Sequence, residues 1–281
     1  MFRNVMSTRN MTSTTTPPSV DHGAPDPSTD GTSTSSRGTR VLGVLCIVGL
    51  AVLGVFTFAI SPPDSNLGDS VRIMYIHVPT VAWAYLCLIC CAASSITYLV
   101  RRSRFADVLA HASAEIGVLL LGVTLVSGAA WGHITWGTYW EWDARLTTTL
   151  LLFLMFVGYL ALRAVPPSSN AGPGSGAVRA AVVGTVSALM IPVVHKSVEW
   201  WASLHQGATS FGTLDGNIEG SQQFTLWLSF GVGSLVAVWL LMHRFRVGWL
   251  TAAAQDVALD EAIVARRAGA AGRVADAGAG S

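Results

Sequence analysis

Six long apolar runs alternate with shorter polar segments along most of this chain. They cover approximately residues 41–60, 79–100, 113–131, 146–165, 177–195 and 223–243. Each run is close to the ~20 residues that a helix needs to cross the hydrocarbon core of a bilayer. The apolar positions are continuous and do not alternate every second residue, which predicts helices and not barrel strands. The pattern therefore indicates an all-α polytopic membrane protein with six transmembrane helices.

The segments on either side of these runs have a different composition. Residues 1–39 are rich in Ser, Thr, Pro, Gly and Asp, and we predict that they form a disordered cytoplasmic tail. They do not resemble a secretory signal, because the first apolar run begins only at Val41 and is too long. Residues 40–245 form the predicted six-helix membrane domain. Residues 246–281 form a predicted cytoplasmic tail, with a short helix starting near residue 250.

The distribution of basic residues predicts the orientation of the helices. With the N-terminus in the cytoplasm, the inner segments carry fourteen Lys and Arg residues, and the outer loops carry only Arg72, Arg145 and Lys196. Basic residues concentrate on the cytoplasmic side of membrane proteins. We therefore place both termini in the cytoplasm, with outer loops at about 61–78, 131–145 and 196–222.

The composition agrees with lipid as the main solvent. Charged residues make up 12% of the chain and hydrophobic residues 51%, whereas an average soluble domain has about 25% charged residues. The net charge is +1, so the overall charge does not suggest a nucleic-acid partner. Four cysteines, at positions 46, 87, 90 and 91, all lie in apolar runs. We interpret them as buried thiols and not as a disulfide framework.

The central outer loop, residues 131–145, has the sequence WGHITWGTYWEWDAR and contains four tryptophans and a tyrosine. Six of the ten tryptophans of the chain lie in or next to the predicted outer loops. An aromatic belt at the membrane interface normally occurs on both sides of the bilayer. The one-sided cluster therefore favours a flat apolar ligand over a simple interfacial anchor.

Histidines also collect on the predicted outer side. His77 ends the first outer loop, where Pro79 suits the first turn of the second helix. His205 lies in the third outer loop, four residues after Trp201, so the two would share a face if this segment were helical. His133 and His195 are interpreted as hydrogen-bonded interfacial side chains. Two neutral imidazoles beside an aromatic wall are typical of a haem site with two axial histidines, and zinc is a weaker alternative because no closely spaced ligand set occurs.

Two charged residues at the end of the central loop each allow a structural and a functional interpretation. Asp143 precedes the fourth apolar run and is suited to cap that helix. Arg145 can pair with Asp143 or Glu141, or a guanidinium can bind a haem propionate through two hydrogen bonds. Gly137 and Thr138 fit a tight bend that brings aromatic side chains together.

Three segments carry a resemblance to a known family. WGHITWGTYWEWDARLT at 131–147 resembles the tryptophan-rich WWD signature of the haem-handling proteins of cytochrome c maturation. RIMYIHVP at 72–79 and IPVVHKSVEWWASLHQG at 191–207 resemble the flanking signatures of the six-helix CcmC family. Together with the helices, the resemblance covers about residues 41–245. Tyr139 departs from the family pattern, which has a tryptophan at this position.

The resemblance implies a protein of the cell (inner) membrane that binds haem b on its outer face. It implies delivery of haem to a CcmE-like haem chaperone, beside a CcmD-like small membrane protein and a CcmAB-like ABC transporter. The family's axial ligands correspond to His77 and His205. Its WWD residues correspond to the following positions: Trp131, Gly132, Trp136, Gly137, Thr138, Tyr139, Trp140, Trp142, Asp143 and Arg145.

Three other functions compete with haem handling. A cytochrome c synthase of the larger WWD type would act as an enzyme, but such proteins usually have more helices and further histidines within the membrane. An electron-transfer subunit would place paired histidines inside helices, and a scaffold without a cofactor leaves the aromatic cluster unexplained. We therefore expect a haem-binding transfer protein and not an enzyme.

Overall fold

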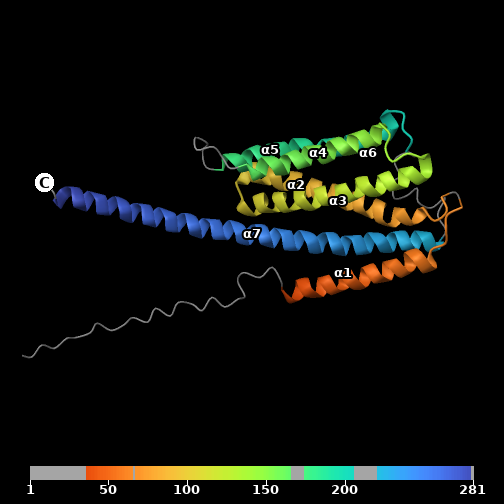
Figure 1. Ribbon diagram of the computed structural model, residues 1–281, viewed down its shortest axis with the longest axis horizontal. Helices are drawn as coiled ribbons and strands as arrows, with labels where there is room; N and C mark the ends of the chain where they lie inside the picture. Colours follow the sequence, from red (N-terminus) through yellow and green to blue (C-terminus); the bar gives the residue numbers. More distant parts are fainter. Residues whose placement is uncertain (1–35, 66, 166–173, 206–219, 280–281) are drawn as a thin grey trace, which may run out of the picture. The chain divides into compact units, whose positions relative to one another are not determined.

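The computed structural model describes residues 36–65, 67–165, 174–205 and 220–279, and in these ranges the chain is helical (Figure 1). Apart from an isolated bridge between Asp64 and Gly68, the described part of the chain contains no strand. The elements in order are α1 (Arg37–Val55), the π-helix η1 (Phe56–Ile60), α2 (Val71–Arg101), α3 (Arg104–Trp136), α4 (Ala144–Ala164), α5 (Ser175–Ala188), α6 (Met190–Trp200) and α7 (Gly220–Ala279).

Six segments in this described part are long and apolar enough to cross a membrane, because α1 continues into η1 and α5 and α6 together form one span. The prediction of an all-α protein with six spanning helices is confirmed. The helices are longer than the apolar runs. Residues 1–35 of the predicted N-terminal tail lie outside the described residues, and Arg37–Arg40 already belong to α1. At the other end, residues 246–279 continue α7 without a break, so the expected short C-terminal helix is part of a longer one.

The fifth span is interrupted at Leu189 because of Pro192. A proline has no N–H for the helical hydrogen bond and its ring clashes with the carbonyl four residues earlier, which here belongs to Ala188. At this point the chain forms a tight turn, in which the Leu189 N–H donates to the Val186 carbonyl at 3.1 Å. The helix restarts at Met190 and ends at Trp200, so α6 has only 11 residues.

Helices α2 and α3 form the centre of the bundle and pack closely through small residues. A Cβ atom on Gly117 would lie 2.5 Å from Cδ2 of Leu88, so a larger residue would require the Leu88 side chain to move. Small residues let helix backbones approach in a membrane, where lipid provides no hydrophobic force between helices. The shared core also takes in buried side chains of α4, α5 and α6, among them Phe156, Tyr159 and Val194. Cys46, Cys87 and Cys91 are buried free thiols, as predicted, whereas the fourth free thiol, Cys90, is only partly buried.

Paired charges hold the helices together where α2 ends, α3 begins and α4 ends; we call this the arginine end of the bundle. The Arg163 guanidinium donates two hydrogen bonds to the Asp107 carboxylate, at 2.8 and 3.0 Å. Arg244 of α7 pairs with Glu115 of α3, and Arg246 donates to the side chains of Ser36 and Thr39 at the start of α1. These contacts join α1, α3, α4 and α7.

Candidate functional site

The tryptophan-rich segment lies at the opposite end of α3, which we call the aromatic end. The structure corrects the predicted loop 131–145, because α3 continues to Trp136 and the non-helical part is only 137–143. Gly137 ends α3 with φ of 78°, a left-handed conformation in which glycine has no steric penalty. The Thr138 hydroxyl then donates to the Trp140 carbonyl at 3.0 Å. The predicted tight bend at these two residues is confirmed.

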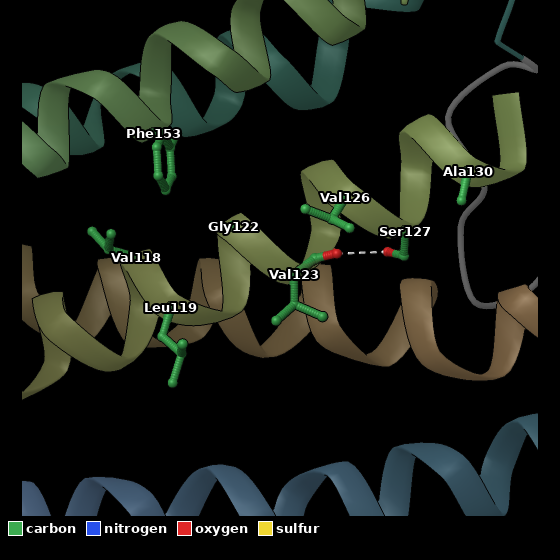
Figure 2. Close-up of a pocket in the computed structure, with 8 residues that line it drawn as sticks. All are labelled: Val118, Leu119, Gly122, Val123, Val126, Ser127, Ala130 and Phe153. Carbon is green, nitrogen blue, oxygen red and sulfur yellow. Dashed lines mark hydrogen bonds between the residues drawn. The ribbon is translucent and has the colours of Figure 1, made fainter. Parts of the chain in front are cut away.

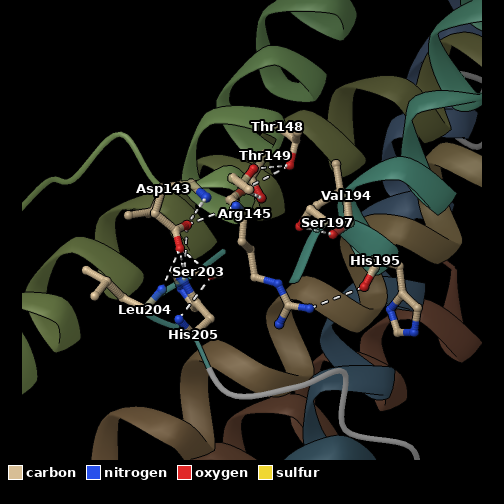
Figure 3. Close-up of polar contacts among 12 residues, drawn as sticks. Asp143, Arg145, Thr148, Thr149, Val194, His195, Ser197, Ser203, Leu204 and His205 are labelled. Carbon is tan, nitrogen blue, oxygen red and sulfur yellow. Dashed lines mark hydrogen bonds and ion pairs between the residues drawn. The ribbon is translucent and has the colours of Figure 1, made fainter. Parts of the chain in front are cut away.

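Asp143 organises the polar contacts of this end (Figure 3). One carboxylate oxygen accepts hydrogen bonds from the backbone N–H groups of Arg145 and Leu146, so the predicted N-cap of α4 is confirmed. The other oxygen accepts from the Ser203 hydroxyl and from Leu204 N–H, the latter at 2.9 Å. The carboxylate therefore ties the start of α4 to the segment that follows α6.

The same carboxylate contacts His205, whose Nδ1 lies 3.3 Å from Oδ2 of Asp143. Burial raises the pKa of Asp143, but hydrogen bonds from Ser203 and Leu146 outweigh it and lower the pKa to about 2. Burial also lowers the pKa of His205, which the nearby carboxylate only partly offsets. At neutral pH this imidazole is therefore neutral. Its Nδ1–H faces the carboxylate, and no hydrogen bond to its Nε2 occurs within the described part of the chain.

His77 lies in the second turn of α2 and not at the end of a loop. The structure corrects the predicted helix start at Pro79, because α2 begins at Val71 and includes this proline. The missing N–H of Pro79 leaves a helical bond unmade, and in the same turn the Thr80 hydroxyl donates to the Ile76 carbonyl at 2.6 Å. The side chain of His77 is directed at the aromatic end of α3.

Ser127 of α3 fixes the tautomer of His77. The Ser127 hydroxyl donates its only proton within α3, mainly to the Val123 carbonyl at 2.8 Å. Its oxygen is 3.0 Å from Nδ1 of His77, and with the hydroxyl proton given to Val123 this oxygen accepts a hydrogen bond from the ring. As with His205, Nδ1 carries the proton and Nε2 is the atom left to bind a metal. Gly128 makes room for this ring, because a Cβ atom there would lie 3.0 Å from Cε1 of His77.

Two tryptophans of α3 each contact one of the two histidines. Trp131 meets His77 edge to face at 5.8 Å between ring centroids, and Trp136 meets His205 in the same way at 4.8 Å. The Trp131 indole N–H is buried and has no hydrogen-bond partner in the described structure. Within the described residues, the aromatic end therefore has a buried hydrogen-bond donor, the Trp131 N–H, on the ring that contacts His77.

The remaining aromatic residues of the segment are arranged around these contacts. Trp140 and Trp142 form an edge-to-face pair with a centroid distance of 5.7 Å. Gly132 is buried below Trp136, where a Cβ atom would lie 3.2 Å from its ring. Tyr139 is exposed and stacks on His133 at 4.0 Å, with an angle of 6° between the rings. His133 therefore contacts the outside of the segment and neither candidate ligand.

Arg145 lies between the Asp143 cluster and the end of α6 (Figure 3). Its guanidinium donates to the His195 carbonyl at 3.3 Å. No ion pair of Arg145 with Asp143 or Glu141 occurs in the described ranges, so the predicted pairing is not formed. Trp201 begins a non-helical segment after α6, so the conditional prediction that Trp201 and His205 share a helical face is wrong.

Comparisons with known proteins identify the family. The family model described as "Heme exporter protein C" matches residues 26–259. The chain belongs to the heme exporter protein C family. Three relatives carry this same name. The Bradyrhizobium diazoefficiens protein is 43% identical over 57% of this chain and 59% of its own length. The Haemophilus influenzae protein is 37% identical over 72% and 81%, and that of Escherichia coli strain K12 is 36% identical over 72% and 80%.

Every candidate site residue of this heme exporter protein C family member lies inside the matched range. Sequence reasoning missed three residues that the structure adds: Ser127 and Gly128 beside His77, and Ser203 beside Asp143 and His205. Ser203 lies two residues before His205, so its proximity was visible in the sequence. Ser127 is 50 residues from His77, and no sequence pattern connects them.

Proposed function

We propose that this protein holds haem b at the aromatic end, with His77 and His205 as the axial ligands, and passes it to a CcmE-like haem chaperone. Membership of the heme exporter protein C family supports a role in haem handling for cytochrome c maturation. The observation that carries the residue assignment is the shared state of the two imidazoles. In each, Nδ1 is held by the protein and Nε2 is left for iron.

The surrounding residues suit a flat, amphiphilic cargo. Trp131 and Trp136 offer apolar surface next to the two imidazoles, and burial of a macrocycle against them would contribute most of the binding energy. A haem also carries two propionates, which need donors. The Arg145 guanidinium and the unpartnered Trp131 N–H are the groups that we assign to them. Gly132, Gly137 and Thr138 shape the segment, and Tyr139, Trp140 and Trp142 complete its aromatic surface.

Exposure of the site suits transfer to a partner. The side chains of Tyr139 and Trp142 are largely exposed, as are those of Trp200 and Trp201 at the end of α6. A partner can therefore approach the aromatic end directly. We propose that this end faces the outside of the inner membrane, and that a CcmD-like protein and a CcmAB-like ABC transporter work beside it. On this proposal the protein binds and transfers haem and does not itself catalyse covalent attachment.

The test compares single alanine substitutions. His77→Ala and His205→Ala proteins purified from haem-replete cells should lose most of their haem and the low-spin spectrum of the remainder. His133→Ala is the matched control, because this imidazole stacks on Tyr139 at the same end without contacting the candidate ligands. Unchanged low-spin haem in either of the first two variants would contradict the ligand assignment. Loss of haem in the control alone would identify His133 as the ligand instead.

Delivery has a separate test. Haem-loaded protein is mixed with a purified CcmE-like chaperone, and haem is followed spectroscopically on each partner. Transfer should depend on the loaded protein and be absent with the His77→Ala protein. Retention of haem by the loaded wild type would contradict delivery while leaving haem binding intact.

A further inference from the structure

An apolar groove of about 580 Å³ lies along α3, on the side where α4 passes it (Figure 2). Phe153 of α4 points toward it, and Gly122 leaves its floor open. Eight residues line it: Val118, Leu119, Gly122, Val123, Val126, Ser127, Ala130 and Phe153. Seven of these lie on α3 between positions 118 and 130, a rise of about 18 Å. All are within segments long and apolar enough to cross the membrane.

The groove opens to the lipid and not to the protein core. The Val126 side chain is 73% exposed, and Leu119 and Val123 are also exposed. In a membrane these surfaces contact acyl chains, so a molecule dissolved in the bilayer can reach the groove from the side. The volume lies within the ~300–1,000 Å³ of ordinary small-molecule sites.

One lining residue connects the groove to the candidate haem site. Ser127 is the only lining residue with a polar side chain, and its oxygen accepts the hydrogen bond from His77. At the same end of the groove, Ala130 directly precedes Trp131, which contacts the His77 ring. Ser127 therefore borders both the groove and His77, the first candidate iron ligand, and the groove ends one residue before Trp131.

We propose that this groove binds the haem macrocycle from the bilayer and guides it to His77. The inference rests on the proposed function and adds the site at which the cargo enters. The lining has no charged group, so it accepts the apolar macrocycle and not the propionates. These carboxylates would stay near the aromatic end, where Arg145 lies. The contact between the lining residue Ser127 and His77 favours haem over a partner's transmembrane helix as the occupant.

Two substitutions fill the groove without touching the proposed ligands or the tryptophans. Gly122→Leu places a side chain on the floor, and Val126→Trp places one at the exposed rim. The matched control is Val186→Trp, which puts the same bulk on an exposed position of α5. Purified proteins in vesicles would be mixed with haem-loaded vesicles, and the rate of haem uptake would be recorded together with the spectrum.

We expect both groove variants to take up haem from vesicles at least fivefold more slowly than wild type and Val186→Trp. Haem supplied in detergent should give all four proteins the same final occupancy and spectrum, which also shows that the variants are folded. Wild-type uptake rates in both groove variants would overturn the proposal and leave lipid as the occupant. Normal uptake with loss of a co-purifying membrane protein would also overturn it, in favour of a helix-docking surface. Wild type that binds no haem would contradict the proposed function instead.

Discussion

The polar groups at the two ends of the helix bundle differ in whether they are paired within the protein. At the arginine end, Arg163 pairs with Asp107 and Arg244 with Glu115, although a buried nitrogen of Arg104 has no hydrogen-bond partner in the described structure. At the aromatic end, the protein uses one nitrogen of His77 and of His205 and leaves the other available, and the Trp131 N–H has no partner in the described structure. The arginine end therefore depends mainly on charge pairs within the bundle, whereas the aromatic end contains the groups that we assign to a ligand.

Helix α3 runs from one end of the bundle to the other. Substitutions at its two ends can therefore test the comparison. Asp107 and Trp136 both belong to α3 and are separated by about 44 Å along the helix axis. Effects of substitutions at such a distance are normally independent. Changes at the arginine end should therefore alter stability, and changes at the aromatic end should alter haem binding.

The largest effect is expected for Asp107→Asn at the arginine end. Its pair with Arg163 is mostly buried, with 13% and 23% of the two side chains exposed. Removal of the carboxylate leaves the guanidinium without its counter-charge and should cost about 3 kcal/mol of stability. Thermal unfolding in detergent would measure this loss, while the haem spectrum should not change. Asp69→Asn is the control, because the Asp69 side chain is 74% exposed and its pair with Arg72 should contribute below about 1 kcal/mol. A changed haem spectrum in Asp107→Asn would show that the ends are not independent.

Next in size is Asp143→Asn at the aromatic end. The amide oxygen can still cap α4, but its NH₂ group would face the Leu204 N–H and the His205 Nδ1–H, which are also donors. Loss of such a partner typically weakens metal binding about 10- to 100-fold. Haem titration of the purified protein would measure the affinity. An affinity equal to that of wild type would mean that the carboxylate serves only as a helix cap.

A smaller effect is expected for Ser127→Ala, which removes the acceptor that holds His77 Nδ1–H. We expect haem affinity to fall about tenfold, with a shifted reduction potential of the bound haem. Ser127→Thr is the matched control, because it keeps the hydroxyl and should retain most of the affinity and the potential. Equal losses in both variants would point to a packing role and contradict the tautomer argument.

The smallest effect is expected for Tyr139→Trp, which restores the residue that the family pattern has at this position. Tyr139 is exposed and stacks on His133, away from both candidate ligands. The tryptophan keeps a flat ring, so haem affinity should change less than about twofold, in line with the small energy of an exposed aromatic pair. A larger change in the same titration would show that the ring at position 139 contributes more to haem binding than an exposed residue at the edge of the aromatic surface should.

The sequence predicted the helical architecture because apolar length is a direct requirement of the bilayer. It did not predict where the helices end. The rule that places proline in the first helical turn put the start of α2 at Pro79, although α2 begins eight residues earlier at Val71. In the same way, polar and aromatic residues beyond Trp131 suggested a loop, although helical hydrogen bonds continue to Trp136. Residues at a membrane interface can be polar without leaving the helix.

The candidate site was predictable only in part. His77, His205 and the tryptophans belong to recognisable local patterns, and Asp143 has the position of a helix cap. The contact between Ser127 and His77 and that between Asp143 and His205 join residues 50 and 62 positions apart. Such contacts depend on how α2, α3 and the segment after α6 pack together, and a single sequence contains no signal of that packing.

The interruption of the fifth span at Leu189 has a kinetic consequence. His77 is part of a 31-residue helix packed in the centre of the bundle, whereas His205 follows an 11-residue helix that is separated from α5. Haem with two axial ligands begins to dissociate when the first of the two ligands releases the iron. We expect that ligand to be His205, so the hold of Asp143 on the segment beyond α6 would set the lifetime of bound haem.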